Sequence, residues 1–284
     1  MPFLKLDGSA RLHYGERGSG PTVIMVHGSP GEGRAWANVV KHLPEGLRVL
    51  TPDLPGYGGS DPLPAGYLVR TEAMAAAIGE LVGRCESPVW LCGHSYGGNV
   101  ALHTAVRHRE RVAGAVLLEP VFLRALELTN DLETFRTAKA FFVSYLVRAE
   151  FAEDDAIGGM IDFWCGDGTF ARLPAQVRGA LNSAVSGNAE DVRASFAETI
   201  SAALLASFDR PVTIGHGDSG PRIVGEIAGS LAKLLPRART TPIHGAAHLM
   251  LNTHPESVAR LIQTSLYAQR ADGPGGKERL GTNH

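Results

Sequence analysis

Short runs of apolar residues alternate with amphipathic stretches over the first 121 residues of the chain. Continuous apolar runs between helical stretches are typical of a parallel sheet that helices cover on both faces. The pattern predicts strands at Phe3–Leu6, Arg11–Glu16, Thr22–Val26, Arg48–Pro52, Pro88–Cys92 and Val112–Leu118. It predicts helices at Arg34–Leu43, Thr71–Arg84 and Asn99–Arg107. Residues 1–121 are therefore expected to form the first part of an α/β core.

The pattern changes between residues 122 and 207, where no strand is predicted and aromatic residues are frequent. Helices are expected at Leu123–Leu128, Glu133–Arg148, Asp154–Trp164 and Asp191–Leu205. We interpret this segment as a helical cap that is inserted into the core.

Strand and helix alternate again over residues 208–268, the expected second part of the core. Strands are predicted at Pro211–Gly215 and Ala238–Ile243, and helices at Arg222–Leu235 and Pro255–Tyr267. Residues 269–284 are polar and rich in glycine, so a disordered tail is expected there. Together the patterns predict an α/β fold with a mostly parallel eight-stranded sheet, helices on both faces and an inserted helical cap.

Composition limits the partners of the protein. A formal net charge of -2 and a pI of about 6.6 leave no broad basic surface, so we expect neither nucleic acid nor a membrane as a partner. Cys85, Cys92 and Cys165 are too few and too widely spaced for a disulfide framework or a zinc site, which favours a cytoplasmic location. The sequence has no recognisable signal peptide and no apolar run of roughly 20 residues. A small-molecule substrate is the expected partner, and a homodimer stays an open alternative.

A candidate nucleophile follows the strand Pro88–Cys92. The sequence Gly93-His94-Ser95-Tyr96-Gly97 fits the G-x-S-x-G pattern, and a helix is predicted directly after it. In such a turn the serine takes a strained conformation, and small neighbours avoid clashes beside it. The serine hydroxyl then stands at a helix N-terminus, where N–H groups stabilise negative charge. The alternative is a plain glycine-rich turn with an exposed serine, and we expect His94 to have a structural role.

A second glycine-containing turn, His27-Gly28-Ser29, ends the strand Thr22–Val26. Acyl transfer requires two N–H donors for the oxyanion. The backbone N–H of Tyr96, directly after the nucleophile, is one candidate, and the backbone N–H of Ser29 is the other. Pro30 has no N–H to offer. The alternative is a turn that only ends the strand.

The order and spacing of four segments resemble those of the α/β-hydrolase superfamily. These segments are His27–Gly31, Asp53–Ser60, Gly93–Gly98 and Gly245–His248. The resemblance implies the fold but leaves the reaction open, since the same scaffold carries esterases, thioesterases, amidases, C–C bond hydrolases, hydroxynitrile lyases and cofactor-free dioxygenases. Dehalogenases and epoxide hydrolases of this superfamily use an aspartate nucleophile, and Ser95 argues against both. The Asp53 carboxylate is expected to accept hydrogen bonds from backbone amides of its loop.

The candidate general base is one of eleven histidines. The resemblance implies a catalytic histidine after the last strand, and His248 matches that position. Its loop, Gly245-Ala246-Ala247, is at the carboxyl edge of the expected sheet, from which a base can reach the nucleophile. His244 and His254 are each open to a structural reading.

The acid of the triad departs from the pattern that the resemblance implies. Relatives carry an aspartate after the penultimate strand, but Gly220 occupies that position here, and Asp218 comes two residues earlier. Glu119 directly follows the apolar strand Val112–Leu118, and a buried carboxylate at that point is costly unless it is paired. We therefore prefer Glu119 as the acid and keep Asp218 as the alternative.

These residues predict an acyl-enzyme route with Ser95 as nucleophile, His248 as base and Glu119 as acid, without a metal or an organic cofactor. The aromatic cap favours a small apolar substrate, so a carboxylesterase or thioesterase is expected. Trp164 either lines the pocket or packs the cap onto the core. The alternatives are a lyase or cofactor-free oxygenase on the same fold, and a ligand-sensing receptor that turns over slowly.

Overall fold

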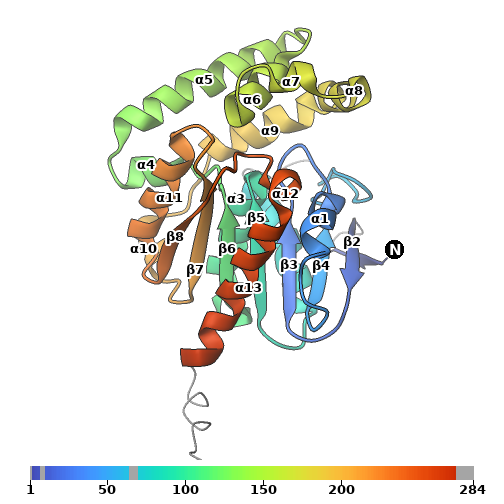
Figure 1. Ribbon diagram of the computed structural model, residues 1–284, viewed down its shortest axis with the longest axis vertical. Coiled ribbons are helices and arrows are strands. Elements are labelled where there is room, and N and C mark those ends of the chain that lie inside the picture. The colour runs from blue at the N-terminus through green and yellow to red at the C-terminus, as the bar shows by residue number, and fades with distance from the viewer. Residues whose placement is uncertain (1, 7–9, 64–69, 273–284) are drawn as a thin grey trace, which may run out of the picture.

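The computed structural model describes residues 2–6, 10–63 and 70–272, and within them an eight-stranded sheet forms the centre of the molecule (Figure 1). The strand order is β1-β2-β4-β3-β5-β6-β7-β8. Strands β1 and β2 pair antiparallel, β2 is antiparallel to β4, and the other neighbours are parallel. The bounds are Phe3–Lys5, Arg11–Arg17, Thr22–Val26, Arg48–Pro52, Val89–His94, Val112–Leu118, Val212–Gly217 and Ala238–Ile243 for β1 to β8. The predicted fold class is confirmed.

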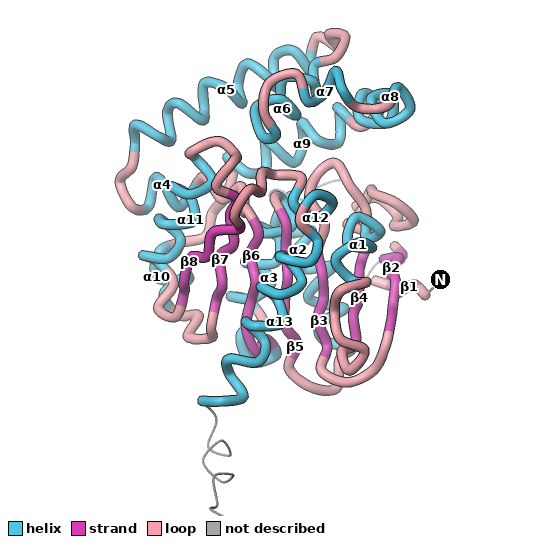
Figure 2. Tube along the Cα trace, viewed as in Figure 1, coloured by secondary structure: helices cyan, strands magenta, loops and turns pink. Residues whose placement is uncertain are grey.

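Helices cover both faces of the sheet (Figure 2). One face packs against α1 (Ala37–Val40), α12 (Met250–Thr253) and α13 (Pro255–Asp272), with Trp36, Met25 and Ile262 in its apolar core. The other face packs against α2 (Arg70–Gly83), α3 (Tyr96–Arg107) and α11 (Ile223–Leu234). All five residues of β3 are buried, as a strand covered on both faces requires. Strands β3, β5, β6 and β7 run parallel, so their carboxyl ends lie at the same edge of the sheet.

The chain leaves the sheet after β6 and returns at β7, and the helices between these two strands lie above this edge or beside the sheet (Figure 1). They are α4 (Arg124–Leu128), α5 (Leu132–Glu150), α6 (Ala156–Cys165), α7 (Thr169–Arg172), α8 (Ala175–Ser183), α9 (Val185–Phe196) and α10 (Ala202–Ala206). Of these, α4 and α10 contact α11 beside the sheet, whereas α5 to α9 form the layer above it. The division of the chain at residues 122 and 207 stays a prediction.

Several predicted helix bounds are wrong. The segment Asp191–Leu205 is not one helix, because α9 ends at Phe196 and Ser201 caps the new helix α10 by accepting a hydrogen bond from the N–H of Leu204 at 3.1 Å. The segment Arg34–Leu43 forms a 3-10 turn, Gly33–Trp36, followed by the short helix α1.

The expected tail also begins too early. Helix α13 continues to Asp272 and so includes the first four residues of the predicted tail, whereas residues 273–284 lie outside the described residues. Among the helices that the structure describes, none has the length and apolar character needed to span a lipid bilayer.

Candidate active site

Ser95 occupies a sharp turn between β5 and α3, with a φ of 55° that non-glycine residues rarely adopt. The turn has no room for a Cβ at the glycines on either side of Ser95. A Cβ on Gly93 would lie 2.3 Å from the carbonyl oxygen of Gly97, and a Cβ on Gly97 would lie 2.2 Å from that of His27. The backbone N–H of Ser95 donates to the carbonyl of Leu118 at 2.9 Å, which ties the turn to the end of β6. The G-x-S-x-G segment thus has the strand–turn–helix context that its chemistry needs.

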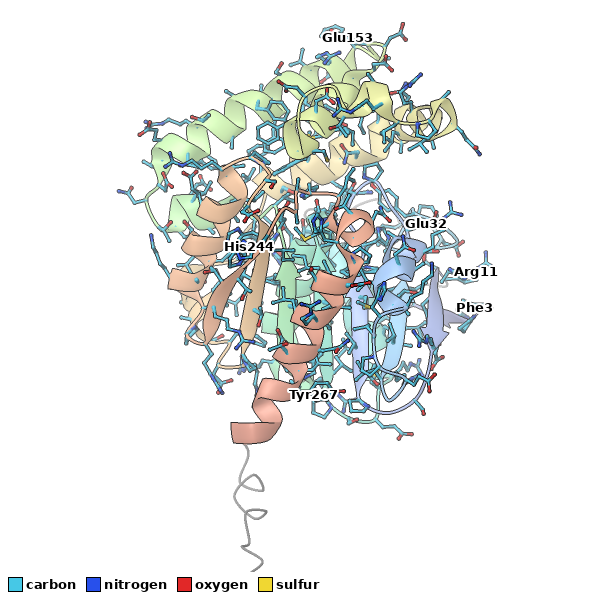
Figure 3. All side chains as sticks on the ribbon, in the orientation of Figure 1. Phe3, Arg11, Glu32, Glu153, His244 and Tyr267 are labelled. Carbon is cyan, nitrogen blue, oxygen red and sulfur yellow. The ribbon has the colours of Figure 1, made fainter. Side chains whose placement is uncertain are left out.

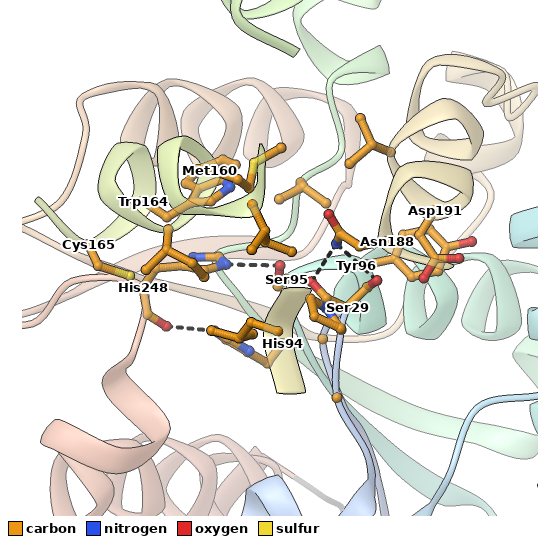
Figure 4. A pocket seen from close by; sticks show the side chains of 18 of the residues that line it. Ser29, His94, Ser95, Tyr96, Met160, Trp164, Cys165, Asn188, Asp191 and His248 are labelled. Carbon is orange, nitrogen blue, oxygen red and sulfur yellow. Dashed lines mark hydrogen bonds between the residues drawn. The ribbon is translucent and has the colours of Figure 1, made fainter. Parts of the chain in front are cut away.

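His248 joins Ser95 and Glu119 in one hydrogen-bonded series. Its Nε2 lies 2.9 Å from Ser95 Oγ, and its Nδ1 lies 2.6 Å from Glu119 Oε2 (Figure 4 shows the first contact). An ionised carboxylate only accepts hydrogen bonds, so the proton of the neutral ring belongs on Nδ1 and the lone pair of Nε2 faces the serine hydroxyl. The three side chains can therefore pass a proton from the serine to the imidazole.

Glu119 is 1% exposed, and both of its oxygens are satisfied. Oε1 accepts from the backbone N–H of Gly217 at 2.8 Å, while Oε2 contacts His248. This is possible because β6 lies between β5 and β7, so the residue after β6 stands between the serine turn and the start of the β7 loop. Contacts on both oxygens offset the cost of burying the carboxylate.

The alternative acid, Asp218, lies at the surface. Its carboxylate accepts from the backbone N–H of Gly245 at 2.7 Å and contacts His244 Nδ1 at 2.8 Å. His244 is 85% exposed and stands at the carboxyl end of β8 (Figure 3). The His244 ring and the Gly245 N–H hold the pKa of Asp218 below its usual range. Asp218 thus holds the loop that leads to His248, whereas the carboxylate that contacts His248 itself is that of Glu119.

The two candidate oxyanion donors flank Ser95. A Cβ on Gly28 would lie 3.0 Å from Ser95 Cβ, so the backbone that leads into Ser29 runs directly beside the nucleophile. Tyr96 begins α3, and the N–H groups of a first helical turn have no acceptor within the helix. Ser29 and Tyr96 line the same cavity as Ser95 and His248. In the part of the chain that the structure describes, neither backbone N–H donates to a protein acceptor.

Trp164 and His94 hold His248 in place, the first at its ring and the second at its backbone carbonyl (Figure 4). Trp164 of α6 stacks on it, with ring centroids 4.7 Å apart and an angle of 21° between the planes. His94 Nε2 donates to the His248 carbonyl at 2.9 Å. Burial, and then the neighbouring His248, lower the pKa of His94 well below its usual range, so it is a neutral structural group. Trp164 both lines the cavity and packs the cap onto the core, and the sequence alone could not choose between these roles.

A cavity of about 330 Å³ opens between this site and the cap. Its walls are mostly apolar and include Phe142, Ile157, Met160, Leu173, Val192 and Phe196. Asn188 and Asp191 of α9 add polar groups to one wall. The sequence pattern does not distinguish these two residues, because polar positions on a cap helix are equally typical of a solvated face.

The Asp53 carboxylate also has the contacts that the sequence predicts. Oδ1 accepts from the backbone N–H of Gly33 at 2.6 Å, and Oδ2 accepts from that of Gly59 at 2.8 Å and contacts His13 Nδ1 at 2.7 Å. Burial alone raises the pKa of Asp53, but these contacts outweigh it and hold the pKa below its usual range. Asp53 therefore ties together the loops that surround β4, away from the triad.

Comparison with known proteins agrees with this architecture. The model of the Alpha/beta hydrolase family matches residues 23–261. A pimeloyl-[acyl-carrier protein] methyl ester esterase of Aromatoleum aromaticum is 30% identical over 253 residues, which cover 86% of this chain and 97% of the relative. A soluble epoxide hydrolase of Corynebacterium sp. is 36% identical, but over only 39% of this chain and 38% of its own length. The solved structure of a thermophilic esterase from Thermogutta terrifontis covers 94% of this chain and 99% of its own, with 26% identity and a TM-score of 0.68.

Proposed function

The chain belongs to the alpha/beta hydrolase family, and from that premise we propose that it is a serine hydrolase that cleaves carboxylic esters or thioesters of small apolar substrates. The observation that carries the proposal is the series of hydrogen bonds from Ser95 through His248 to Glu119. A serine with an adjacent base is an acyl-transfer nucleophile. The esterases among the similar proteins, each matched over most of its length, support the same choice.

In the proposed reaction, His248 takes the proton of Ser95 while the serine oxygen attacks the carbonyl carbon of the substrate. The carbonyl oxygen becomes an oxyanion, which the N–H groups of Ser29 and Tyr96 stabilise. The oxyanion collapses, His248 gives its proton to the leaving alcohol or thiol, and an acyl-serine remains. Water then attacks this ester with His248 again as base, and the acid is released. Glu119 keeps the imidazole in the required tautomer and stabilises its positive charge.

The cavity supports the proposed substrate class. Its volume of about 330 Å³ is at the lower end for small-molecule sites, and its walls are mostly apolar. Three unpaired cysteines fit the proposed cytoplasmic location, where thiols stay reduced.

The test is a panel of p-nitrophenyl esters and matching acyl thioesters of graded acyl length, assayed with wild type, Ser95→Ala and Ser183→Ala. Ser183 is an exposed cap serine and serves as the matched control. Wild type and the control should turn over short acyl chains, whereas Ser95→Ala should lose at least about 10⁴-fold in kcat. Wild type that reacts covalently with a serine-directed probe but hydrolyses neither ester nor thioester would contradict the proposal and favour a lyase or oxygenase.

A further inference from the structure

Ser29 belongs to a set of buried and half-buried polar side chains that joins the cap to the core. We call it the α9 polar cluster, and it consists of Ser29, Tyr57, Arg70, Tyr145, Asn188 and Asp191. The two α9 members are almost fully buried, with Asn188 3% and Asp191 1% exposed. Burying the polar groups of Asn188 and Asp191 costs free energy unless each finds a partner, so the contact between α9 and the core is a specific polar one.

Asn188 contacts Ser29 at two atoms (Figure 4). Its Nδ2 donates to the backbone carbonyl of Ser29 at 2.9 Å and to Ser29 Oγ at 3.1 Å. A carbonyl can only accept, so the amide NH₂ of Asn188 must face Ser29. The other end of the amide is fixed as well, because Tyr145 Oη donates to Asn188 Oδ1 at 2.6 Å. The orientation of Asn188 is therefore determined from both sides.

Asp191, one helical turn further along α9, reaches Ser29 through Tyr57. Its carboxylate accepts from the Tyr57 hydroxyl and from Arg70 Nε, the latter at 2.5 Å. The Tyr57 hydroxyl lies 3.0 Å from Ser29 Oγ. Burial raises the pKa of Asp191, and the Arg70 charge opposes that rise. The side chain of Ser29 is thus held from α9 directly and from the core through Tyr57.

We propose that Asn188 is a positioning residue that directs the backbone N–H of Ser29 at the oxyanion, a role that rests on the proposed function. Holding the carbonyl and the hydroxyl of Ser29 fixes its ψ and χ1 and the place of its Cα, and so limits how far the nitrogen that carries the N–H can shift. Oxyanion donors act within a narrow range of about 2.7–3.1 Å, so a small tilt of this N–H weakens transition-state binding more than substrate binding. The cap then contributes to catalysis as well as to the shape of the pocket.

The test compares Asn188→Leu with wild type and with Asn182→Ala, an exposed cap asparagine outside the cavity. Loss of a whole oxyanion donor costs about 10²–10³-fold in kcat, so for a misdirected one we expect kcat to fall about 10–100-fold and KM to change less than about threefold. Asn182→Ala should match wild type. The pH profile of kcat/KM should keep its shape in Asn188→Leu, because Asn188 does not contact His248.

A second readout follows the oxyanion without turnover. A trifluoromethyl ketone forms a tetrahedral adduct with a catalytic serine, and Asn188→Leu should weaken its binding by the same factor as it lowers kcat/KM. Tyr145→Phe removes the hydroxyl behind Asn188 and should lower kcat about threefold with KM unchanged. If Asn188→Leu does not fold, this milder variant decides the question.

Three outcomes would overturn the positioning role. They are a folded Asn188→Leu enzyme with the kcat of wild type, a rise in KM alone, and a displaced pH profile. If only Tyr145→Phe folds, an unchanged kcat in that variant would also overturn the positioning role. Failure of the proposed function looks different, because wild type itself would then hydrolyse none of the esters.

Discussion

Replacing Glu119 by Gln should remove most of the activity, and the contacts of the carboxylate explain why. Both of its partners are donors, namely the backbone N–H of Gly217 and the Nδ1–H of His248. A glutamine offers one acceptor oxygen and one NH₂ group. If the oxygen faces Gly217, the NH₂ donates to Nδ1, the ring proton moves to Nε2, and the imidazole can no longer accept the proton of Ser95. The opposite orientation leaves the Gly217 N–H facing another donor.

The size of the expected loss in kcat follows from the distance between the Glu119 carboxylate and the His248 ring. At the 2.6 Å separation of Glu119 Oε2 from His248 Nδ1, a carboxylate and an imidazolium interact by about 6 kcal/mol at an effective dielectric of about 20. A neutral hydrogen bond from glutamine restores about 1 kcal/mol of this. The remaining loss of about 5 kcal/mol corresponds to a factor of between about 10³ and 10⁴ in kcat.

The assay is steady-state hydrolysis of the best ester of the panel, with Ser95→Ala as background. Asp218→Asn is the matched control, because it makes the same chemical change in the surface carboxylate, and it should stay within about twofold of wild type. Thermal unfolding of each variant checks that the fold is intact. Full activity in folded Glu119→Gln, or a large loss in Asp218→Asn, would refute the reasoning.

Two further predictions concern the surroundings of the triad. Trp164→Leu should lower kcat about 3–30-fold, because the stacked indole no longer stabilises the imidazolium of His248, whereas Trp164→Phe keeps an aromatic face and should retain most of the activity. Equal kinetics of wild type and Trp164→Leu would contradict this. Asp53→Asn should destabilise the fold by about 2–3 kcal/mol at neutral pH in urea unfolding. Contacts hold the folded-state pKa of Asp53 below its ordinary value of 3.8. The ionised carboxylate therefore stabilises the fold at pH values above 3.8, and this stabilisation is lost as the pH falls through the folded-state pKa. The difference in the free energy of unfolding between wild type and Asp53→Asn should therefore become smaller as the pH falls. A difference that grows on acidification would contradict this account of Asp53.

Local patterns predicted the sheet and the elements that carry the triad. The predicted bounds of β3, β4, β6 and β8 agree with the structure residue for residue. For β3 and β6 the reason is burial on both faces, which leaves an uninterrupted apolar signal, whereas β8 lies at the edge and is partly exposed. The preference for Glu119 over Asp218 also came from a local argument, since a carboxylate directly after a buried strand needs a partner. The geometry pairs Glu119 with His248 and leaves Asp218 on the surface.

The cap was harder to predict for a physical reason. Hydrophobic periodicity reports which face of a helix is buried, but not which distant residue it meets. Asn188 lies 159 positions from the Ser29 carbonyl that it contacts, and no pattern in either segment specifies the pair. The short helices α7 and α8 were missed because α7 has only four residues and no residue of α8 is buried.

His248 stands in the loop that follows β8, an edge strand of the sheet. Among the strands that the structure describes, β8 pairs with β7 alone, and three of its six residues are exposed. Edge elements separate from a structure at lower free energy than the interior does. We therefore expect moderate heating to separate His248 from Ser95 before the rest of the sheet unfolds. Inactivation by heat should then precede denaturation, and cooling should restore the enzyme without refolding of the whole chain.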